Sequence, residues 1–90
     1  MKITFDEAKR ASTLQARGLD FAEADLVFAG PTVTLEDTRR DYGETRWISM
    51  GLLNRRPVVL VWTPRGDARR IISMRYAHDH EAEKFGLDLG

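Results

Sequence analysis

The chain has 90 residues, no cysteine, and 14 basic residues against 14 acidic ones. This length predicts one small domain over residues 1–90 with a single core. The absence of cysteine excludes disulfides, thiolate nucleophiles and cysteine-ligated zinc. No apolar stretch is long enough to span a membrane, and residues 1–9 lack the apolar run of a signal peptide. We therefore expect a cytoplasmic protein that makes no membrane contact.

Although the net charge is zero, basic and acidic residues are unevenly distributed along the chain. Residues 1–38 carry four bases and seven acids, residues 39–75 carry nine bases and three acids, and residues 76–90 carry one base and four acids. All nine bases of the middle segment are arginine, whose planar guanidinium suits phosphate and carboxylate groups. This pattern indicates either a solvated rim of a sheet or an anionic partner, which is nucleic acid or an acidic protein.

The N-terminal third predicts two helices. Residues 2–5 are too few for more than an edge strand or a lead-in. Asp6 is a good N-cap for a helix that ends at Gly18, a residue that favours the left-handed C-terminal position. Asp20 caps a second helix, which the pair Gly30-Pro31 closes.

The rest of the chain predicts strands and one last helix. The expected strands are residues 32–35, 45–53, 58–62 and 69–76, with turns at 36–43, 54–56 and 63–67. After Tyr76, helical spacing begins and Gly86 is the expected stop. The expected fold class is α+β: two N-terminal helices, a four-stranded antiparallel sheet whose last three strands form a meander, and a C-terminal helix. We expect the helices to pack on one face of the sheet.

The sequence contains no glycine-rich phosphate loop and no nucleophile elbow. His78 and His80 are two residues apart, which on a helix directs them differently and argues against a metal site. The remaining arginine, histidine and glutamate side chains suit phosphodiester cleavage without a metal or cofactor. Such a reaction needs a base for the ribose 2′-OH, an acid for the 5′-oxygen, and fixed cations for the phosphorane.

Three arginines, Arg46, Arg70 and Arg75, are the candidates for holding the phosphate if they meet at one rim of the sheet. Arg70 and Arg75 lie on opposite faces of a regular strand, so they share a face only if a bulge intervenes. Arg75 is equally well explained as an ion-pair partner of Glu81. Trp47 suits the edge of the core or, beside Arg46, the stacking of a base.

Several short segments occur in the order and spacing of a known family. They are Phe5-Asp6 with Lys9, residues 14–21 (LQARGLDF), Ala24, Val27-Phe28, Gly43-Glu44 with Arg46, Gly51, Val61, Thr63, Arg65-Gly66, and residues 70–75 (RIISMR) with Ala77 and Glu81. In these features the chain resembles the BrnT family of type II toxin–antitoxin ribonucleases, which are similar in fold to RelE-type toxins. The turn that is often Lys-His-Gly in that family is Ala16-Arg17-Gly18 here, and arginine cannot act as a base near neutral pH.

The resemblance implies an RNA endonuclease toxin that needs no metal, inhibits translation and is neutralised by a BrnA-type antitoxin. That antitoxin has a ribbon-helix-helix domain and alone contacts operator DNA, in a complex of two toxins and two antitoxins. The catalytic positions implied are Arg46, Arg70 and Arg75, with Glu81 or His78 moving protons, and the RNA-binding positions are Lys9, Arg17, Trp47, Arg65 and Arg69.

Two other functions remain open from the sequence. The first is an inactive module that only docks the antitoxin and takes part in promoter repression. The second is a stand-alone nucleic-acid-binding domain, which the acidic ends of the chain disfavour because they repel a long polyanion.

Overall fold

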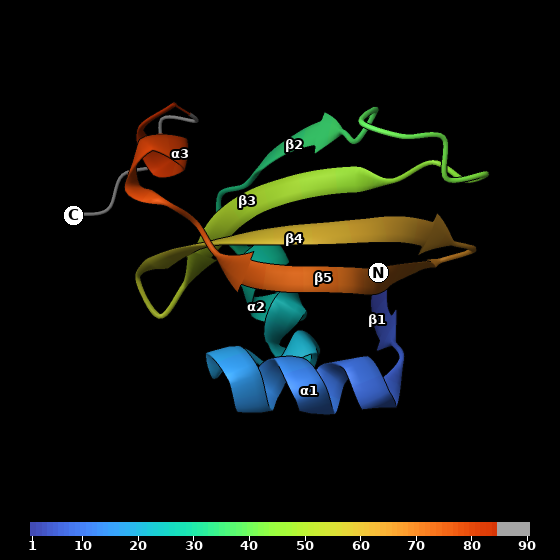
Figure 1. Cartoon of the computed structure of the whole chain (residues 1–90), viewed down its shortest axis with the longest axis horizontal. Coiled ribbons are helices and arrows are strands. Elements are labelled where there is room, and N and C mark those ends of the chain that lie inside the picture. The colour runs from blue at the N-terminus through green and yellow to red at the C-terminus, as the bar shows by residue number, and fades with distance from the viewer. Residues whose placement is uncertain (85–90) are drawn as a thin grey trace.

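A five-stranded mixed sheet organises the chain (Figure 1). The computed structural model describes residues 1–84. The strands are β1 (Lys2–Phe5), β2 (Val33–Glu36), β3 (Trp47–Leu53), β4 (Arg56–Arg65) and β5 (Ala68–Tyr76). Their order across the sheet is β1-β5-β4-β3-β2, so β4 is central as its apolar sequence predicted. The α+β class and the β3-β4-β5 meander are confirmed.

The expected four-stranded antiparallel sheet is wrong in one respect. Residues 2–5 form an edge strand that pairs in parallel with β5, with Lys2 opposite Ala68 and Phe5 opposite Ile71. A parallel pair needs a crossover connection, and here most of the chain forms it. Four residues carry too little periodicity to reveal a partner so distant in the sequence.

The helices are α1 (Glu7–Arg17), α2 (Ala24–Ala29) and α3 (Asp79–Lys84), with a 3-10 turn, η1, at Phe21–Glu23. The expected caps of α1 are confirmed: Asp6 accepts from two backbone N–H groups of the first turn, and Gly18 has φ 70°. The second expected helix is divided, because Asp20 caps η1 and not α2. Within residues 1–84, no helix has the length and apolar character to cross a bilayer. The expected stop at Gly86 lies outside the described residues.

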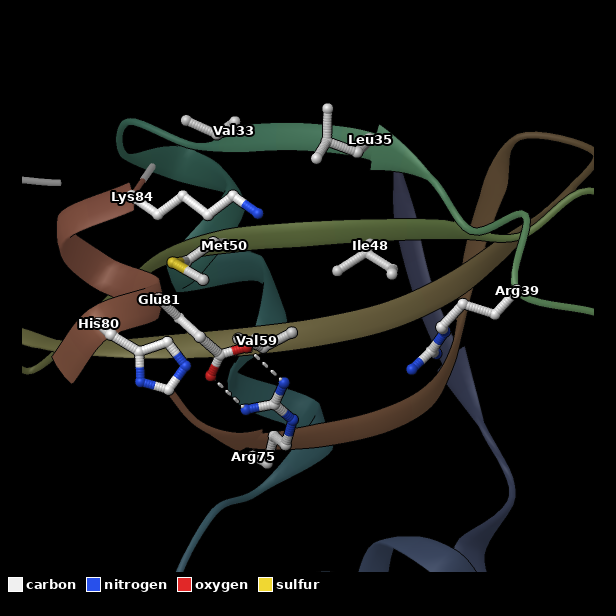
Figure 2. Close-up of a pocket in the computed structure, with 10 residues that line it drawn as sticks. All are labelled: Val33, Leu35, Arg39, Ile48, Met50, Val59, Arg75, His80, Glu81 and Lys84. Carbon is white, nitrogen blue, oxygen red and sulfur yellow. Dashed lines mark hydrogen bonds and ion pairs between the residues drawn. The ribbon is translucent and has the colours of Figure 1, made fainter. Parts of the chain in front are cut away.

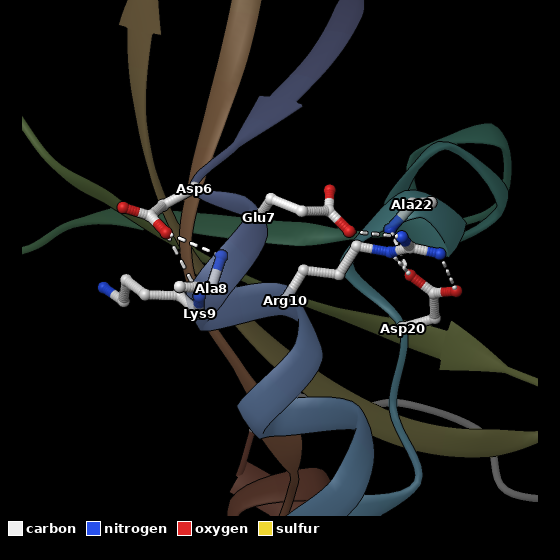
Figure 3. Close-up of polar contacts among 7 residues, drawn as sticks. All are labelled: Asp6, Glu7, Ala8, Lys9, Arg10, Asp20 and Ala22. Carbon is white, nitrogen blue, oxygen red and sulfur yellow. Dashed lines mark hydrogen bonds and ion pairs between the residues drawn. The ribbon is translucent and has the colours of Figure 1, made fainter.

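An ion pair ties α1 to the start of η1. Arg10 donates to both carboxylate oxygens of Asp20, at 2.8 and 3.0 Å, and to Glu7 at 2.7 Å (Figure 3). Because Asp20 also caps η1, the same carboxylate holds the N-terminal half of α1 against the start of η1.

Helix α2 covers one face of the sheet, which we call the α2 face. Phe21, Val27, Leu60, Ile71 and Met74 are almost fully buried there. Gly51 of β3 has no side chain between the sheet and α2, and a Cβ on this residue would lie 2.6 Å from Val27 Cγ1. The absence of a side chain at this position therefore sets how closely α2 approaches the sheet.

Helix α3 lies on the opposite face, which we call the α3 face (Figure 1). The expectation that all helices pack on one face is therefore wrong. Strand β4 is apolar on both faces: Val58, Leu60 and Trp62 belong to the core on the α2 face, whereas Val59 lies on the α3 face. Val59, on the α3 face, is also buried at 3% exposure.

A β-bulge in β5 changes which side chains share a face. The pairing passes from Val61 opposite Ser73 to Trp62 opposite Ile71, so Ile72 has no partner on β4. Arg70 lies opposite Thr63 and Arg75 opposite Val59, and these two β4 residues are on the same face. The bulge therefore brings both arginines to the α3 face, which a regular strand would not do.

Candidate functional site

The sheet and α3 enclose a pocket of about 320 Å³, which we call the α3 pocket (Figure 2). Its floor is apolar and its rim is charged. The floor is formed by Val33, Leu35, Ile48, Met50 and Val59, and the rim by Arg39, Arg75, His80, Glu81 and Lys84. The alternating residues of β2, β3 and β4 supply the floor because they point away from the core.

Arg75 and Glu81 form a bidentate ion pair at this pocket. Nη1 donates to Oε1 and Nη2 to Oε2, both at 2.8 Å. Glu81 Oε1 also accepts from the backbone N–H of His78 at 2.9 Å, so the carboxylate fixes the start of α3. The Arg75 guanidinium, aided by that N–H, lowers the pKa of Glu81 to about 2. The ion-pair interpretation of Arg75 is therefore confirmed.

The two histidines differ in their relation to the α3 pocket. His80 is part of the lining, whereas His78 precedes α3 and lies outside the pocket, and both histidines are exposed. Their rings stack at 5.8 Å between centroids and 5° between planes, so the expected divergence of the pair is wrong. Helical spacing does not apply because α3 begins at Asp79. No three or more metal-ligating side chains gather within residues 1–84.

Arg39 enters the α3 pocket from the loop after β2. Its guanidinium donates to both oxygens of Asp37, at 2.8 and 2.9 Å, and the Tyr42 hydroxyl donates to the same carboxylate at 3.0 Å. Arg39 holds the pKa of the buried Asp37 carboxyl well below its usual range. Arg39 could not be predicted from the sequence, because a polar turn region does not show which side chain folds back onto the sheet.

A second pocket of about 190 Å³, which we call the arginine pocket, opens on the α3 face near the β4–β5 turn. Lys9, Glu44, Arg46, Arg65 and Arg70 supply its charged side chains, together with Asp6. Glu44 accepts from Arg46 Nε at 3.2 Å and from Arg65 Nη2 at 3.1 Å.

The structure divides the three arginines expected to hold one phosphate. Arg46 and Arg70 line the arginine pocket, whereas Arg75 lines the α3 pocket. Their partners on β4, Thr63 and Val59, are four residues apart, which corresponds to about 13 Å along a strand. The expectation that all three share a single pocket is therefore wrong, although they share a face of the sheet.

The other expected RNA-binding residues lie in different places. Lys9 and Arg65 line the arginine pocket. Arg17 Nη1 donates to the Met74 carbonyl at 2.8 Å and so holds the end of α1 against β5. Arg69 stacks on Phe28, 4.0 Å from the ring centroid, and Trp47 packs against the core, so the structure brings neither to the pockets.

The comparisons with known proteins identify a family. Residues 5–81 match the family model described as "Ribonuclease toxin, BrnT, of type II toxin-antitoxin system". The matched residues include every residue that lines the two pockets except Lys84. A search of curated proteins finds no match. A type II system pairs the toxin with a protein antitoxin, so the family implies both a ribonuclease activity and a protein partner. On this match the chain belongs to the BrnT family of ribonuclease toxins.

Proposed function

We propose that this chain is a cytoplasmic RNA endonuclease that inhibits translation and needs neither a metal ion nor a cofactor. Its inhibitor would be a BrnA-type antitoxin with a ribbon-helix-helix domain, in a complex of two toxins and two antitoxins that contacts operator DNA through the antitoxin. The family supports a ribonuclease toxin with a protein antitoxin. The observation that carries the reaction is that Arg75, His80 and Glu81 line one pocket.

The reaction proposed is attack of a ribose 2′-oxygen on the adjacent phosphate with loss of the 5′-oxygen. Charge accumulates on the phosphorane oxygens, and a guanidinium positioned in advance stabilises it. Two hydrogen bonds to Glu81 hold the Arg75 guanidinium at the pocket, and a phosphate that displaces Glu81 would accept from the same two nitrogens. Arg39 and Lys84 add positive charge to the same rim.

Proton transfer is assigned to His80 in preference to Glu81. A carboxyl with a pKa of about 2 is a weak base near neutral pH, and efficient proton transfer needs a pKa closer to the working pH. Imidazole is the side chain suited to that range, and His80 is the imidazole that lines the pocket. A phosphate that displaced Glu81 from Arg75 would remove the main cause of the low pKa, so Glu81 becomes a stronger base only with RNA bound.

The test is cleavage of single-stranded RNA in the presence of EDTA. We expect Arg75→Ala to lower kcat by about 10²-fold or more, the usual loss when a transition-state donor is removed. His80→Ala should lower kcat much more than His78→Ala, which is the matched control because His78 lies outside the pocket. Intact RNA with the unmodified protein, or equal kcat for Arg75→Ala, contradicts the proposal.

A second candidate function is supported by the same ion pair. Glu81 occupies both branches of the Arg75 fork, and the apolar floor of the α3 pocket suits a peptide side chain as well as a nucleotide. An occupied guanidinium beside an apolar floor is what we expect of an inactive chain that only docks the antitoxin. Induced expression that leaves growth unchanged, while the chain still binds an antitoxin encoded beside it, would favour that function.

A further inference from the structure

The arginine pocket concentrates positive charge from parts of the chain that are far apart in the sequence. Lys9 comes from α1, Arg46 precedes β3, Arg65 ends β4, and Arg70 comes from β5. These four cations face two carboxylates, Asp6 and Glu44, which leaves a formal excess of two positive charges. We propose that this pocket binds a phosphate of the RNA strand other than the one that is cleaved. This inference rests on the proposed ribonuclease function.

The two carboxylates offset only two of the four positive charges, and hydrogen bonds hold both of them in place. One oxygen of Asp6 caps α1 by accepting from the Ala8 and Lys9 backbone N–H groups, at 2.8 and 3.2 Å. Glu44 divides its oxygens between Arg46 and Arg65, and so holds two guanidinium groups at a fixed separation. An anion that enters the pocket therefore meets two guanidinium groups, Arg46 and Arg65, whose positions are already set.

Among the arginines of this pocket, Arg70 is the one whose donors are free within residues 1–84. Its guanidinium makes no hydrogen bond or ion pair with any side chain of residues 1–84, in contrast to Arg46, Arg65 and Arg75. The bulge at Ile72 places it on the α3 face opposite Thr63. A guanidinium can donate two parallel hydrogen bonds to one phosphate, so Arg70 is suited to be the principal contact.

Arg46 is held from two sides, which prepares it to support the same anion. Glu44 accepts from its Nε, and the guanidinium carbon lies 4.0 Å from the centroid of the Tyr42 ring. A stacked guanidinium loses less freedom on binding than a mobile one, so the entropic cost of binding falls.

The lining favours a phosphate over an acidic peptide. Protein interfaces generally have an apolar centre, and the α3 pocket has such a floor, whereas charged groups and Thr63 dominate the arginine pocket. The pockets open on the same face, with partner residues about 13 Å apart along β4. One extended RNA strand can therefore place one phosphate at Arg70 and another at Arg75.

The experiment measures binding of a single-stranded RNA whose 2′-hydroxyls are methylated, so that cleavage cannot occur. Fluorescence anisotropy at several salt concentrations gives Kd and its salt dependence. We expect Arg70→Ala to raise Kd about 5- to 20-fold and to reduce the salt slope by about one ion, as for a lost phosphate contact. Lys9→Ala, on the exposed side of α1, should have a smaller effect in the same direction.

The control is Arg55→Gly, which removes an equal charge from the β3–β4 turn at φ 67°, where glycine is unstrained. Equal Kd values for Arg70→Ala and Arg55→Gly, with circular dichroism confirming that both fold, overturn the proposal. Normal RNA binding by Arg70→Ala combined with loss of antitoxin binding also overturns it, in favour of a peptide carboxylate. RNA binding that depends on Arg70 without any cleavage by the unmodified chain supports the phosphate site and contradicts only the proposed catalysis.

Discussion

The Arg75–Glu81 pair gives a prediction about stability that does not depend on any activity. Glu81→Gln keeps the shape of the side chain but removes the charge and replaces one of the two accepting oxygens with an NH2 donor. The carboxylate holds β5 to the start of α3 through Arg75 and the His78 N–H, so its neutralisation should weaken the attachment of α3.

The magnitude follows from the pKa of Glu81. A fall of this pKa from 4.5 to about 2 corresponds to about 3 kcal/mol of the free energy of unfolding. The Arg75 side chain is 36% exposed and that of Glu81 is 22% exposed, so solvent screens part of this interaction. We therefore expect Glu81→Gln to lower the free energy of unfolding by about 1–2 kcal/mol at pH 7.

The pH dependence has a definite sign. A carboxyl whose pKa is lowered in the folded state contributes its full stabilisation above the unfolded pKa and loses it as pH falls through the folded pKa. For Glu81 this window runs from about 4.5 down to about 2. The difference between the unmodified chain and Glu81→Gln should be constant from pH 7 to 5 and should shrink below pH 4.5.

The assay is urea unfolding followed by tryptophan fluorescence and circular dichroism at pH 7, 5, 4 and 3. Glu83→Gln is the matched control, because Glu83 is an exposed carboxylate on the same short helix. Its free energy of unfolding should change by less than about 0.5 kcal/mol. The reasoning is refuted if Glu81→Gln and Glu83→Gln are equally stable at pH 7, or if the loss caused by Glu81→Gln persists unchanged at pH 3.

Three further outcomes are expected. Gly51→Ala should lower the free energy of unfolding by about 1–3 kcal/mol in urea titrations, because the new methyl group lies 2.6 Å from Val27 Cγ1. Asp37→Asn should speed amide hydrogen exchange in residues 37–46, because the buried carboxylate accepts from Arg39 and Tyr42, and should cost about 1–3 kcal/mol in thermal unfolding. EDTA should leave RNA cleavage unchanged when the product is followed on gels, and a loss restored by added Mg²⁺ would contradict metal-independent chemistry.

The parts of the fold that could be predicted from the sequence depend on local signals. Asp6 and Gly18 mark the ends of α1 because each provides what a helix terminus requires within a few residues. The meander follows from short turns between strands, since such turns force neighbouring strands to pair. The Arg75–Glu81 pair could also be anticipated, because its partners are six residues apart at a junction of strand and helix.

The parts that could not be predicted depend on contacts between distant residues. The parallel pairing of β1 joins residues 2–5 to residues 68–71, and no local pattern specifies such a partner. The position of α3 on the face opposite α2 depends on how the chain turns after Tyr76, which the last strand does not encode. For the same reason His80 could not be distinguished from His78, because only the packing of α3 shows which ring enters the pocket.

The β-bulge shows how one residue decides the arrangement of a site. Ile71 and Ile72 are both apolar, so the sequence fits a regular strand with either isoleucine facing the core. The core against α2 selects Ile71, at 2% exposure, and three residues later Met74, at 0%, which regular alternation cannot satisfy together. The extra residue at Ile72 resolves this conflict and turns Arg70 to the face that carries Arg75. The packing of two buried side chains on one face therefore determines which cations share the opposite face.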